Sequence, residues 1–381
     1  MRIYKYIYMC IIILFYLVVN IFMQAVKHRN SPINAIVDSV FDKDAANFWL
    51  QKINPLWSFN QALGKIVRKD QTAQDTVSLT IKTNKHFKMG EAGQHHPVII
   101  TSNGRCYERT YSLTQLDLNH VLLTVKRVQK GVVSQWFCDH AKMGDLVEFG
   151  LPYGDMLLPQ TAAHLEQAES VLLLAAGSGI TPMYSLIKAA LKQDSKTSIH
   201  LMYWVKTPED AAFKSELELL ATQHPQFKCS VFYTQTLEAD ARLNASHLNL
   251  IENLAQTTVY ACGPSGFTST AEQVFEGAKI VKTEAFSLSE FVSDDYGFVQ
   301  VTLTKSNKTV NIPKGQSILM GLEQQNIQPT HGCRMGICNK CACNKAQGST
   351  KNLVNGATNT EPGNLLKICV NSAQTDLTID L

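Results

Sequence analysis

The sequence predicts a multidomain protein with a hydrophobic N-terminal helix, an antiparallel β-barrel, an α/β domain built on a parallel sheet, and a small α+β domain. Three observations predict this order. The chain has 381 residues, more than one ordinary domain contains. Its hydrophobic pattern alternates with period two over 64–160 and then changes to apolar strands separated by helices over 168–286. Five of its ten cysteines lie beyond residue 330.

The overall composition is that of a globular protein. Hydrophobic residues make up 45% of the chain and charged residues 18%, which excludes intrinsic disorder. The net charge of +3 is small for this size, and no Lys- or Arg-rich block occurs, so a nucleic-acid partner is not expected. The remaining cysteines are scattered, which favours a reducing compartment with one local metal site over a framework of disulfides.

The N-terminal segment, 1–30, is predicted to be a hydrophobic anchor. Residues 6–26, "YIYMCIIILFYLVVNIFMQAV", form an apolar run of 21 residues, and about 20 residues are needed to cross a bilayer. The length of the run and the absence of a small-x-small site argue against a cleaved signal peptide. We therefore expect one anchor in the cytoplasmic membrane with the other domains in the cytoplasm. The alternative is that Met23 is the true start, which would make the protein cytoplasmic.

The next segment, 31–63, is an apolar and aromatic leader. Its sequence "DAANFWLQKINPLWSFNQAL" predicts a helix that is broken at Pro55. The same composition suits packing on the body of the protein or contact with a membrane surface, and both alternatives stay open.

Residues 64–160 are predicted to form the antiparallel barrel. Alternating apolar residues mark the buried faces of two strands: Val77, Leu79 and Ile81, and Val121, Leu123 and Val125. The tripeptides "NGR" and "MGD" indicate turns between short strands.

Residues 168–286 are predicted to form the parallel α/β domain. The stretch "SVLLLAAGSGITPMYSLIKAALKQ" reads as a buried strand, a glycine turn and a helix, and further strands are "SIHLMYWV", "FKCSVFYT" and "TTVYACG". Ligands of such sheets bind at the carboxyl ends of the strands. We expect the binding site at that edge.

Residues 297–381 follow the polar, acidic linker "SLSEFVSDDYG". They are predicted to contain a strand pair ("FVQVTLT" and "KTVNI"), a helix near "SILMGLEQQ", a cysteine loop, and a closing strand in which Leu377, Ile379 and Leu381 alternate. This mixture of strands and one helix defines the α+β part of the chain.

The cysteine loop carries the strongest chemical signal. Its spacing is Cys333-x4-Cys338-x2-Cys341 with a distant fourth ligand, Cys369, which is the plant-type [2Fe–2S] arrangement. Structural zinc, the alternative, normally takes two ligand pairs of short spacing. The loop resembles that of plant-type ferredoxins, and the order of strands and helix resembles their β-grasp fold.

Two residues of this loop differ in role from the predicted ligands. Asn339 stands where plant-type ferredoxins often have glycine, which restricts the turn slightly and removes no ligand. Cys343 follows Cys341 by two residues, so both side chains would point the same way in a strand. A free, half-buried thiol is favoured for Cys343 over an alternative ligand.

A flavin site is expected in the barrel, because a flavin converts the two-electron chemistry of a nicotinamide to the one-electron chemistry of the cluster. In "ERTYSL", alternation puts Arg109 and Tyr111 on one face, a cation for a phosphate and a ring to stack on isoalloxazine. Ser112 can hydrogen-bond the reactive edge of that ring. The proposed flavin residues are Arg109, Thr110, Tyr111 and Ser112, with Gly131, Val132, Val133 and Ser134 of a G-x-x-S turn for the pyrophosphate.

The nicotinamide site is expected in the parallel domain. In "AAGSGITPM", Gly177 and Gly179 let the backbone approach a phosphate, and Thr181 and Pro182 open the next helix. In "VYACGPSGF", Cys262, Gly263 and Pro264 end a strand at the carboxyl edge of the sheet. Each stretch alone is also compatible with an ordinary strand-to-helix loop or a core cysteine.

Taken together and in this order, these stretches resemble the ferredoxin–NADP reductase superfamily. "AGQH" (92–95), "GDLVEFGLPYGDM" (144–156) and "TEAFS" (283–287) add to the resemblance. It implies that Cys262 lies beside the nicotinamide, that Glu284 and Phe286 lie near the flavin, and that Ser112, Cys262 and Glu284 are catalytic. It also places Lys206 where the family often has an arginine for the ribose 2′-phosphate, which favours NADPH over NADH. The G-x-x-S turn favours FAD over FMN.

The resemblance implies an NAD(P)H-dependent reductase that passes electrons from the nucleotide through FAD and the [2Fe–2S] cluster to an outside acceptor. The layout resembles the reductase components of bacterial oxygenase and desaturase systems. "NFWLQKINPLW" and "RMGICNKCAC" resemble reductases that serve membrane fatty acyl desaturases. A soluble aromatic-ring oxygenase or mono-oxygenase is the alternative acceptor. A non-catalytic zinc or redox-sensing scaffold is the alternative of another class.

Overall fold

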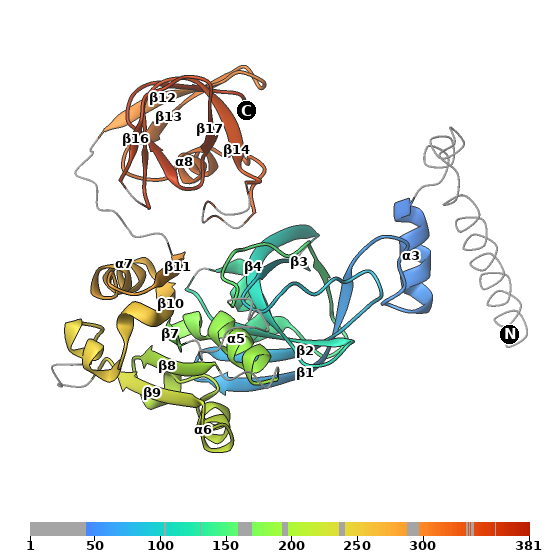
Figure 1. The fold of residues 1–381 in the computed structure, drawn as a ribbon. Helices are drawn as coiled ribbons and strands as arrows, with labels where there is room; N and C mark the ends of the chain where they lie inside the picture. The colour runs from blue at the N-terminus through green and yellow to red at the C-terminus, as the bar shows by residue number, and fades with distance from the viewer. Residues whose placement is uncertain are drawn as a thin grey trace, which may run out of the picture. The chain divides into compact units, whose positions relative to one another are not determined.

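A computed structural model describes most of the chain beyond residue 42. The described residues are 43–102, 104–129, 131–158, 170–192, 197–235, 241–287, 297–332, 334, 336, 339–354 and 356–381. The chain divides into two compact units, Met1–Asn60 and Gln61–Leu381. Figure 1 shows the elements of each unit, coloured from the N-terminus to the C-terminus.

The described part of the first unit contains one helix, α3 (Lys43–Ile53), which ends before Pro55 as the sequence predicts. The side chain of Asn47 holds the segment that follows the helix. Its Oδ1 accepts hydrogen bonds from Ser58 Oγ (3.0 Å) and from the backbone N–H of Phe59 (2.8 Å). Because Asn47 is buried, these bonds satisfy a polar group that would otherwise be costly to bury.

The second unit begins with a closed six-stranded antiparallel barrel. Its strands run in the order β1-β2-β5-β4-β3-β6, with the bounds β1 (Leu63–Ala73), β2 (Thr76–Thr83), β3 (His95–Ser102), β4 (Arg105–Gln115), β5 (His120–Lys126) and β6 (Leu146–Phe149). The two predicted apolar faces meet in register: Val77 pairs with Val125, Leu79 with Leu123 and Ile81 with Val121. All six side chains are buried in the barrel core. After β5, helix α4 (Val132–Gln135) and the π-helix η1 (Trp136–His140) pack on the barrel.

The next domain contains a five-stranded parallel sheet of order β11-β10-β7-β8-β9. The strands are β7 (Ser170–Ala176), β8 (Ser198–Val205), β9 (Phe227–Tyr233), β10 (Thr257–Pro264) and β11 (Ile280–Ser287). The connecting helices are η2 (Gly177–Gly179), α5 (Ile180–Lys192), η3 (Pro208–Asp210), α6 (Lys214–Gln223), η4 (Ala245–Leu250), η5 (Leu254–Gln256) and α7 (Ser265–Val274).

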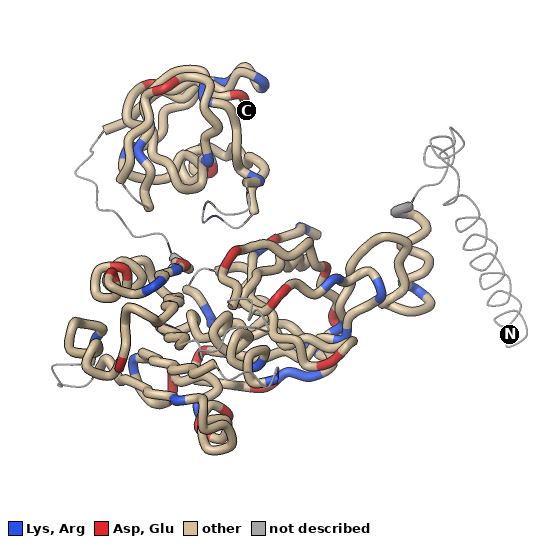
Figure 2. The backbone as a smooth tube through the Cα atoms, viewed as in Figure 1, with Lys and Arg blue, Asp and Glu red and all other residues tan. Residues whose placement is uncertain are grey.

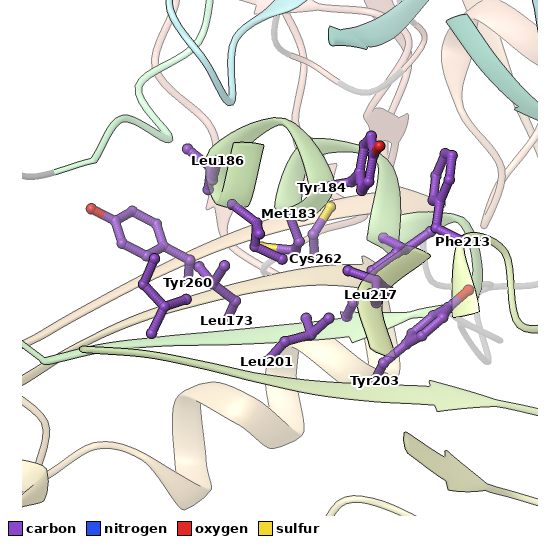
Figure 3. Close-up of a cluster of buried hydrophobic side chains, with 14 of the residues drawn as sticks. Leu173, Met183, Tyr184, Leu186, Leu201, Tyr203, Phe213, Leu217, Tyr260 and Cys262 are labelled. Carbon is purple, nitrogen blue, oxygen red and sulfur yellow. The ribbon is translucent and has the colours of Figure 1, made fainter. Parts of the chain in front are cut away.

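Two hydrophobic clusters cover the two faces of this sheet. Leu173 of β7 faces α5 and α6, in the cluster drawn in Figure 3. Its neighbours Leu172 and Leu174 face α7 on the other side. Burial on both faces explains why these strands are continuous apolar runs and lack alternation.

The order of the strands reverses at β7. The chain proceeds from β7 to β8 and β9 on one side, and β10 then pairs with the other side of β7. In open α/β sheets such a reversal leaves a crevice at the carboxyl ends of the two central strands, where ligands bind. The predicted binding stretches at 177–182 and 262–264 follow or end these two strands.

The last domain contains a five-stranded sheet of order β13-β12-β19-β14-β17, a three-stranded sheet of order β16-β15-β18, and one helix. The elements are β12 (Phe298–Leu303), β13 (Lys308–Pro313), α8 (Ile318–Gln324), β14 (Ala342–Gln347), β15 (Thr350–Asn352), β16 (Thr358–Asn359), β17 (Asn364–Lys367), β18 (Asn371–Ala373) and β19 (Leu377–Ile379). The predicted strand pair, helix and closing strand are all present.

The sequence did not predict every element. Strands β15, β16 and β18 contain two or three residues each, too few to show a period. Strand β11 pairs only with β10, at the edge of the sheet, and its sequence lacks an apolar run. The predicted anchor at 1–30 lies outside the described residues. Within the described residues, no helix is both long and apolar enough to span a bilayer.

Lys345 connects the two sheets of the last domain. Its side chain is fully buried, and its Nζ donates to Gly348 O (3.0 Å) and to both Asn359 O (2.7 Å) and Asn359 Oδ1 (3.0 Å). Three acceptors satisfy the three N–H bonds of the ammonium group. A buried cation of this kind holds the loops that carry its acceptors.

We expect Lys345→Met to lower the free energy of unfolding of the domain formed by 297–381 by about 2 kcal/mol or more, because buried acceptors left without a donor cost about 1–3 kcal/mol each. Urea denaturation followed by circular dichroism and by the visible absorption of the cluster measures this. Lys308→Met, at an exposed position of β13, is the control. Equal unfolding midpoints for the two variants would contradict the role of Lys345.

Candidate active site

The two loops at the reversal point of the sheet are in close contact. A Cβ atom on Gly179 would lie 1.9 Å from the carbonyl oxygen of Cys262, so only glycine fits there. Gly177, two residues earlier, has φ +55°, in the left-handed region that favours glycine. The glycines predicted for a phosphate turn are therefore also required by the backbone. Thr181 and Pro182 lie in the first turn of α5, as predicted.

One cavity of about 580 Å³ contains all eight residues predicted for the flavin. They come from β4 and from the turn that opens α4, and they are Arg109, Thr110, Tyr111, Ser112, Gly131, Val132, Val133 and Ser134. Ser178, Thr181 and Phe286 of the nucleotide domain line the same cavity. The cavity is thus shared between the barrel and the crevice of the parallel sheet.

The charges in this cavity fit an anionic cofactor. Burial lowers the pKa of the Arg109 guanidinium, and the nearby Arg334 guanidinium lowers it further. Both arginines line the cavity. Two cations brought together in a partly buried space are stabilised when a phosphate lies between them. Tyr111 is largely buried beside them, and burial raises the pKa of its hydroxyl, so the ring stays neutral.

A chain of polar side chains crosses one edge of the cavity. His95 of β3 is buried, 2% exposed, and its Nδ1 lies 2.9 Å from Ser112 Oγ. Its Nε2 lies against Oε1 of Glu284, from β11. Ser112 and His95 therefore connect the cavity with Glu284, a partly exposed residue of the nucleotide domain. This arrangement can hold or move a proton next to Ser112.

Cys262 lies deeper than the sequence implied. It is fully buried and belongs to the cluster drawn in Figure 3, beside Leu173 and Met183. Burial raises the pKa of its thiol well above the usual value, and the Glu284 carboxylate raises it further. The thiol is therefore neutral, and among the described residues Cys262 lines neither this cavity nor the next one.

A second cavity, of about 450 Å³, adjoins the first and contains three predicted nucleotide residues: Gly177, Lys206 and Pro264. Arg242 and Lys126 line it as well, so three cationic side chains surround this cavity. Asp210 is also present, but its Oδ2 accepts hydrogen bonds from the N–H and Oγ1 of Thr207, and its Oδ1 lies 4.0 Å from Lys126 Nζ. Gly263 lines neither cavity, and a Cβ atom there would lie 2.8 Å from Cβ of Ala176 and 3.0 Å from Cδ1 of Phe267.

The two cavities have Lys126 in common, and Gly177 of the second cavity directly precedes Ser178 of the first. Lys126 ends β5 of the barrel, and Gly177 follows β7 of the parallel sheet. A ligand that extends through both cavities would pass over this glycine and beside this ammonium group. The arrangement suits a dinucleotide whose pyrophosphate lies at the junction.

Two of the four predicted cluster ligands, Cys333 and Cys338, lie outside the described residues. The other two, Cys341 and Cys369, are both buried and interact with each other. A hydrogen bond with Cys369 lowers the pKa of the Cys341 thiol to about 6, against the opposing effect of burial. A thiol that ionises this readily is suited to bind iron.

The backbone of the cysteine loop explains two features of its sequence. Asn339 has φ +58°, the left-handed conformation in which plant-type ferredoxins place glycine and which asparagine tolerates. Gly336 has φ +76°, and its carbonyl accepts a hydrogen bond from Lys367 Nζ (2.5 Å). Cys343 is buried rather than half-buried, and burial raises the pKa of its thiol to about 12. It is a neutral core side chain.

The matches to known families follow the same order along the chain. Residues 64–157 match the oxidoreductase FAD-binding domain, 173–273 the oxidoreductase NAD-binding domain, and 301–370 the 2Fe-2S iron-sulfur cluster binding domain. An NADPH oxidoreductase of Mycobacterium tuberculosis strain H37Rv is 30% identical over 343 residues, which cover 87% of this chain and 88% of that protein. The chain belongs to the ferredoxin–NADP reductase-type oxidoreductases with a C-terminal [2Fe–2S] ferredoxin domain.

Two further relatives of this reductase family match most of the chain. Phthalate dioxygenase reductase of Burkholderia cepacia is 27% identical, over 83% of this chain and 96% of that protein. A solved structure of phthalate dioxygenase reductase has a TM-score of 0.61 and 26% identity, and covers 84% of this chain and 97% of its own. The reductase is therefore an oxidoreductase with FAD-, NAD- and [2Fe–2S]-binding domains.

Sequence reasoning missed three residues of the site. His95 lies in the stretch "AGQH", whose sequence gives no role to this histidine. Nothing in the sequence connects it with Glu284, 189 positions away. Arg242 follows a segment without a strand or helix pattern. Lys126 ends a strand in which the alternation marks only the apolar residues Val121, Leu123 and Val125, so the pattern assigns no role to the lysine. The roles of all predicted site residues stay predictions that the geometry supports.

We expect His95→Ala to slow the reduction of the bound flavin by NADPH by on the order of 100-fold, because Ser112 and Glu284 lose the group that connects them. Stopped-flow absorbance at the flavin band measures the rate, and the flavin content of the purified variant shows whether the cofactor is retained. His120→Ala, on the partly exposed edge of the barrel, is the control. A full flavin content with an unchanged rate would contradict a role for His95.

Proposed function

We propose that the protein is an NADPH-dependent reductase that passes electrons through FAD and its [2Fe–2S] domain to an oxygenase-type acceptor. One observation carries this proposal: the flavin cavity and the nucleotide cavity adjoin, with Lys126 in both linings and the consecutive residues Gly177 and Ser178 on either side. Cofactors in such cavities would meet at Ser178, Thr181 and Phe286, which line the flavin side.

The bound FAD supplies the chemistry that accepts a hydride and releases electrons singly. The residues of the chain orient it and hold protons nearby. Arg109 would bind a phosphate of the cofactor, Tyr111 would pack on its ring, and Ser112, supported by His95, would hold a proton near it. The buried Cys262 packs in the core behind the two cavities as a neutral side chain.

The acceptor is proposed to be a membrane fatty acyl desaturase. The apolar run at 6–26 supports this, because attachment to the same membrane raises the effective concentration of the two partners. We propose accordingly that the cofactor domains lie in the cytoplasm, where reduced nucleotide is found.

A soluble oxygenase is the second candidate for the acceptor. It is favoured by the similarity to phthalate dioxygenase reductase and to the reductase component of a 3-ketosteroid-9-alpha-monooxygenase of Mycobacterium tuberculosis (28% identical, 67% of this chain, 72% of that protein).

The charge of the ferredoxin domain points to an acidic docking surface on the acceptor. Residues 297–381 contain eight Lys and Arg, one of which (Lys345) is buried, and four Asp and Glu. Figure 2 shows these charges along the tube. Lys340 and Lys367 lie within two positions of the predicted ligands Cys341 and Cys369. A cationic surface around an electron-transfer site steers an anionic partner toward it.

We expect purified protein to oxidise NADPH with an isolated membrane fraction that contains a desaturase, and deletion of the gene to lower the content of unsaturated lipid. Absorption spectra should show a flavin band and a cluster shoulder. A protein without flavin, iron and acid-labile sulfide after anaerobic reconstitution would instead be the non-catalytic scaffold. Unchanged lipids with a lost ability to degrade aromatic or steroid compounds would support the soluble acceptor.

We expect Lys206→Gln and Arg242→Gln each to raise the Kd for NADPH about tenfold while leaving the Kd for NADH unchanged. A charge-assisted hydrogen bond to the 2′-phosphate is worth about 1.5–3 kcal/mol, and NADH lacks this group. Isothermal titration with 2′-AMP, NADPH and NADH separates the effects. Lys228→Gln, an exposed position of β9, is the control. Equal losses for both nucleotides would show that these cations do not select the 2′-phosphate.

A further inference from the structure

The outer face of α3 carries aromatic side chains that the described structure leaves uncovered. Phe48 is 54% exposed and Trp49 is 61% exposed, and Ile53, one turn later, lies beside them at 36%. The two rings contact each other edge to face, with centroids 5.4 Å apart. Exposed aromatic residues in a cluster mark a surface that contacts something apolar.

This exposure is not a consequence of a loose helix end. On the opposite side of α3, Leu50 and Asn47 are buried, and Asn47 binds the 58–60 segment through three hydrogen bonds. The helix is therefore held with its polar, hydrogen-bonded side inward. Its aromatic side is directed to the outside.

A cation accompanies the aromatic cluster. Lys52 Nζ lies 5.1 Å from the centroid of the Phe48 ring. Aromatic rings flanked by lysine are typical of the interface between a bilayer and water, where the ring enters the acyl boundary and the ammonium group reaches the phosphates. Trp in particular is enriched at that depth.

The area of the cluster suits a lipid surface better than a protein partner. Phe and Trp side chains bury about 150–250 Å² each, so the exposed parts of Phe48 and Trp49 offer on the order of 200–300 Å². Stable protein–protein contacts need about 1,000 Å² or more. Contact with a bilayer does not need so large an area, because the rest of the chain already keeps α3 near the membrane surface.

The sequence before α3 supplies that attachment. The apolar run ends at residue 26, and 16 residues, 27–42, separate it from the helix. Sixteen residues span at most about 55 Å. If the run is inserted in a membrane, α3 stays within this distance of the membrane surface.

We propose that α3 is a membrane-contact element: Phe48, Trp49 and Ile53 enter the interfacial layer, and Lys52 binds lipid phosphate. The proposal rests on the membrane attachment given under the proposed function. It adds a second contact, which would hold the start of the catalytic unit at residue 61 close to the bilayer.

The test uses the full-length protein in vesicles of phosphatidylcholine with brominated acyl chains, which quench tryptophan at short range. The chain has four Trp residues, so the contribution of Trp49 is the difference between the native protein and Trp49→Phe. Trp49→Phe/Leu219→Trp is the matched control, because it moves the reporter to an exposed position of α6 (54% exposed). Acrylamide quenching of the same samples reports access from water.

We expect brominated lipid to quench the native protein more than Trp49→Phe, and acrylamide access to Trp49 to fall in vesicles. The reporter on α6 should stay open to acrylamide and unquenched by lipid. Protein that floats with vesicles while Trp49 remains unquenched by lipid overturns the proposal for α3 and leaves membrane attachment intact. Trp49 shielded from both quenchers overturns it in favour of a protein cover, such as the chain's own apolar run. Protein that does not float with vesicles overturns the membrane attachment itself.

Discussion

The contact between Gly179 and the carbonyl of Cys262 is the constraint on which the site depends. It joins the loop after β7 to the end of β10, the two strands between which the sheet reverses its order. Any side chain at Gly179 would push these loops apart, and with them the walls of both cavities. The same contact explains why a cysteine and two glycines far apart in sequence belong to one site: backbone packing brings them together, and a ligand then uses the surface that they form.

Polar groups at the flavin cavity are placed by three strands of two sheets. Ser112 and His95 come from neighbouring barrel strands, which pair in register at these two residues. Glu284 comes from the edge strand of the parallel sheet. The barrel and the nucleotide domain must therefore pack correctly before His95 has both of its partners. This makes the proton-holding part of the site a product of domain packing, whereas Arg109 and Tyr111 depend on one strand alone.

The cluster loop is shaped mainly by contacts within the last domain. The loop turns through left-handed residues at Arg334, Gly336 and Asn339, and Cys369 reaches Cys341 from the turn between β17 and β18. Arg334 is held by both carboxylate oxygens of Glu323, on α8, at 2.5 and 2.9 Å. Local turns, one helix and one ion pair shape a site whose chemistry was already evident in the cysteine spacing.

The sequence by itself determined the parts that depend on local periodicity and spacing: the barrel and the parallel sheet, the [2Fe–2S] domain, and the strand and turn that line the flavin cavity. Only the tertiary structure decided what depends on long-range packing. It placed His95 between Ser112 and Glu284, put Arg242 in the cavity of Lys206, buried Cys262, and directed Phe48 and Trp49 outward on α3. The physical reason is that residues tens to hundreds of positions apart have no common period. Their contacts exist only after the strands are ordered and the domains are packed.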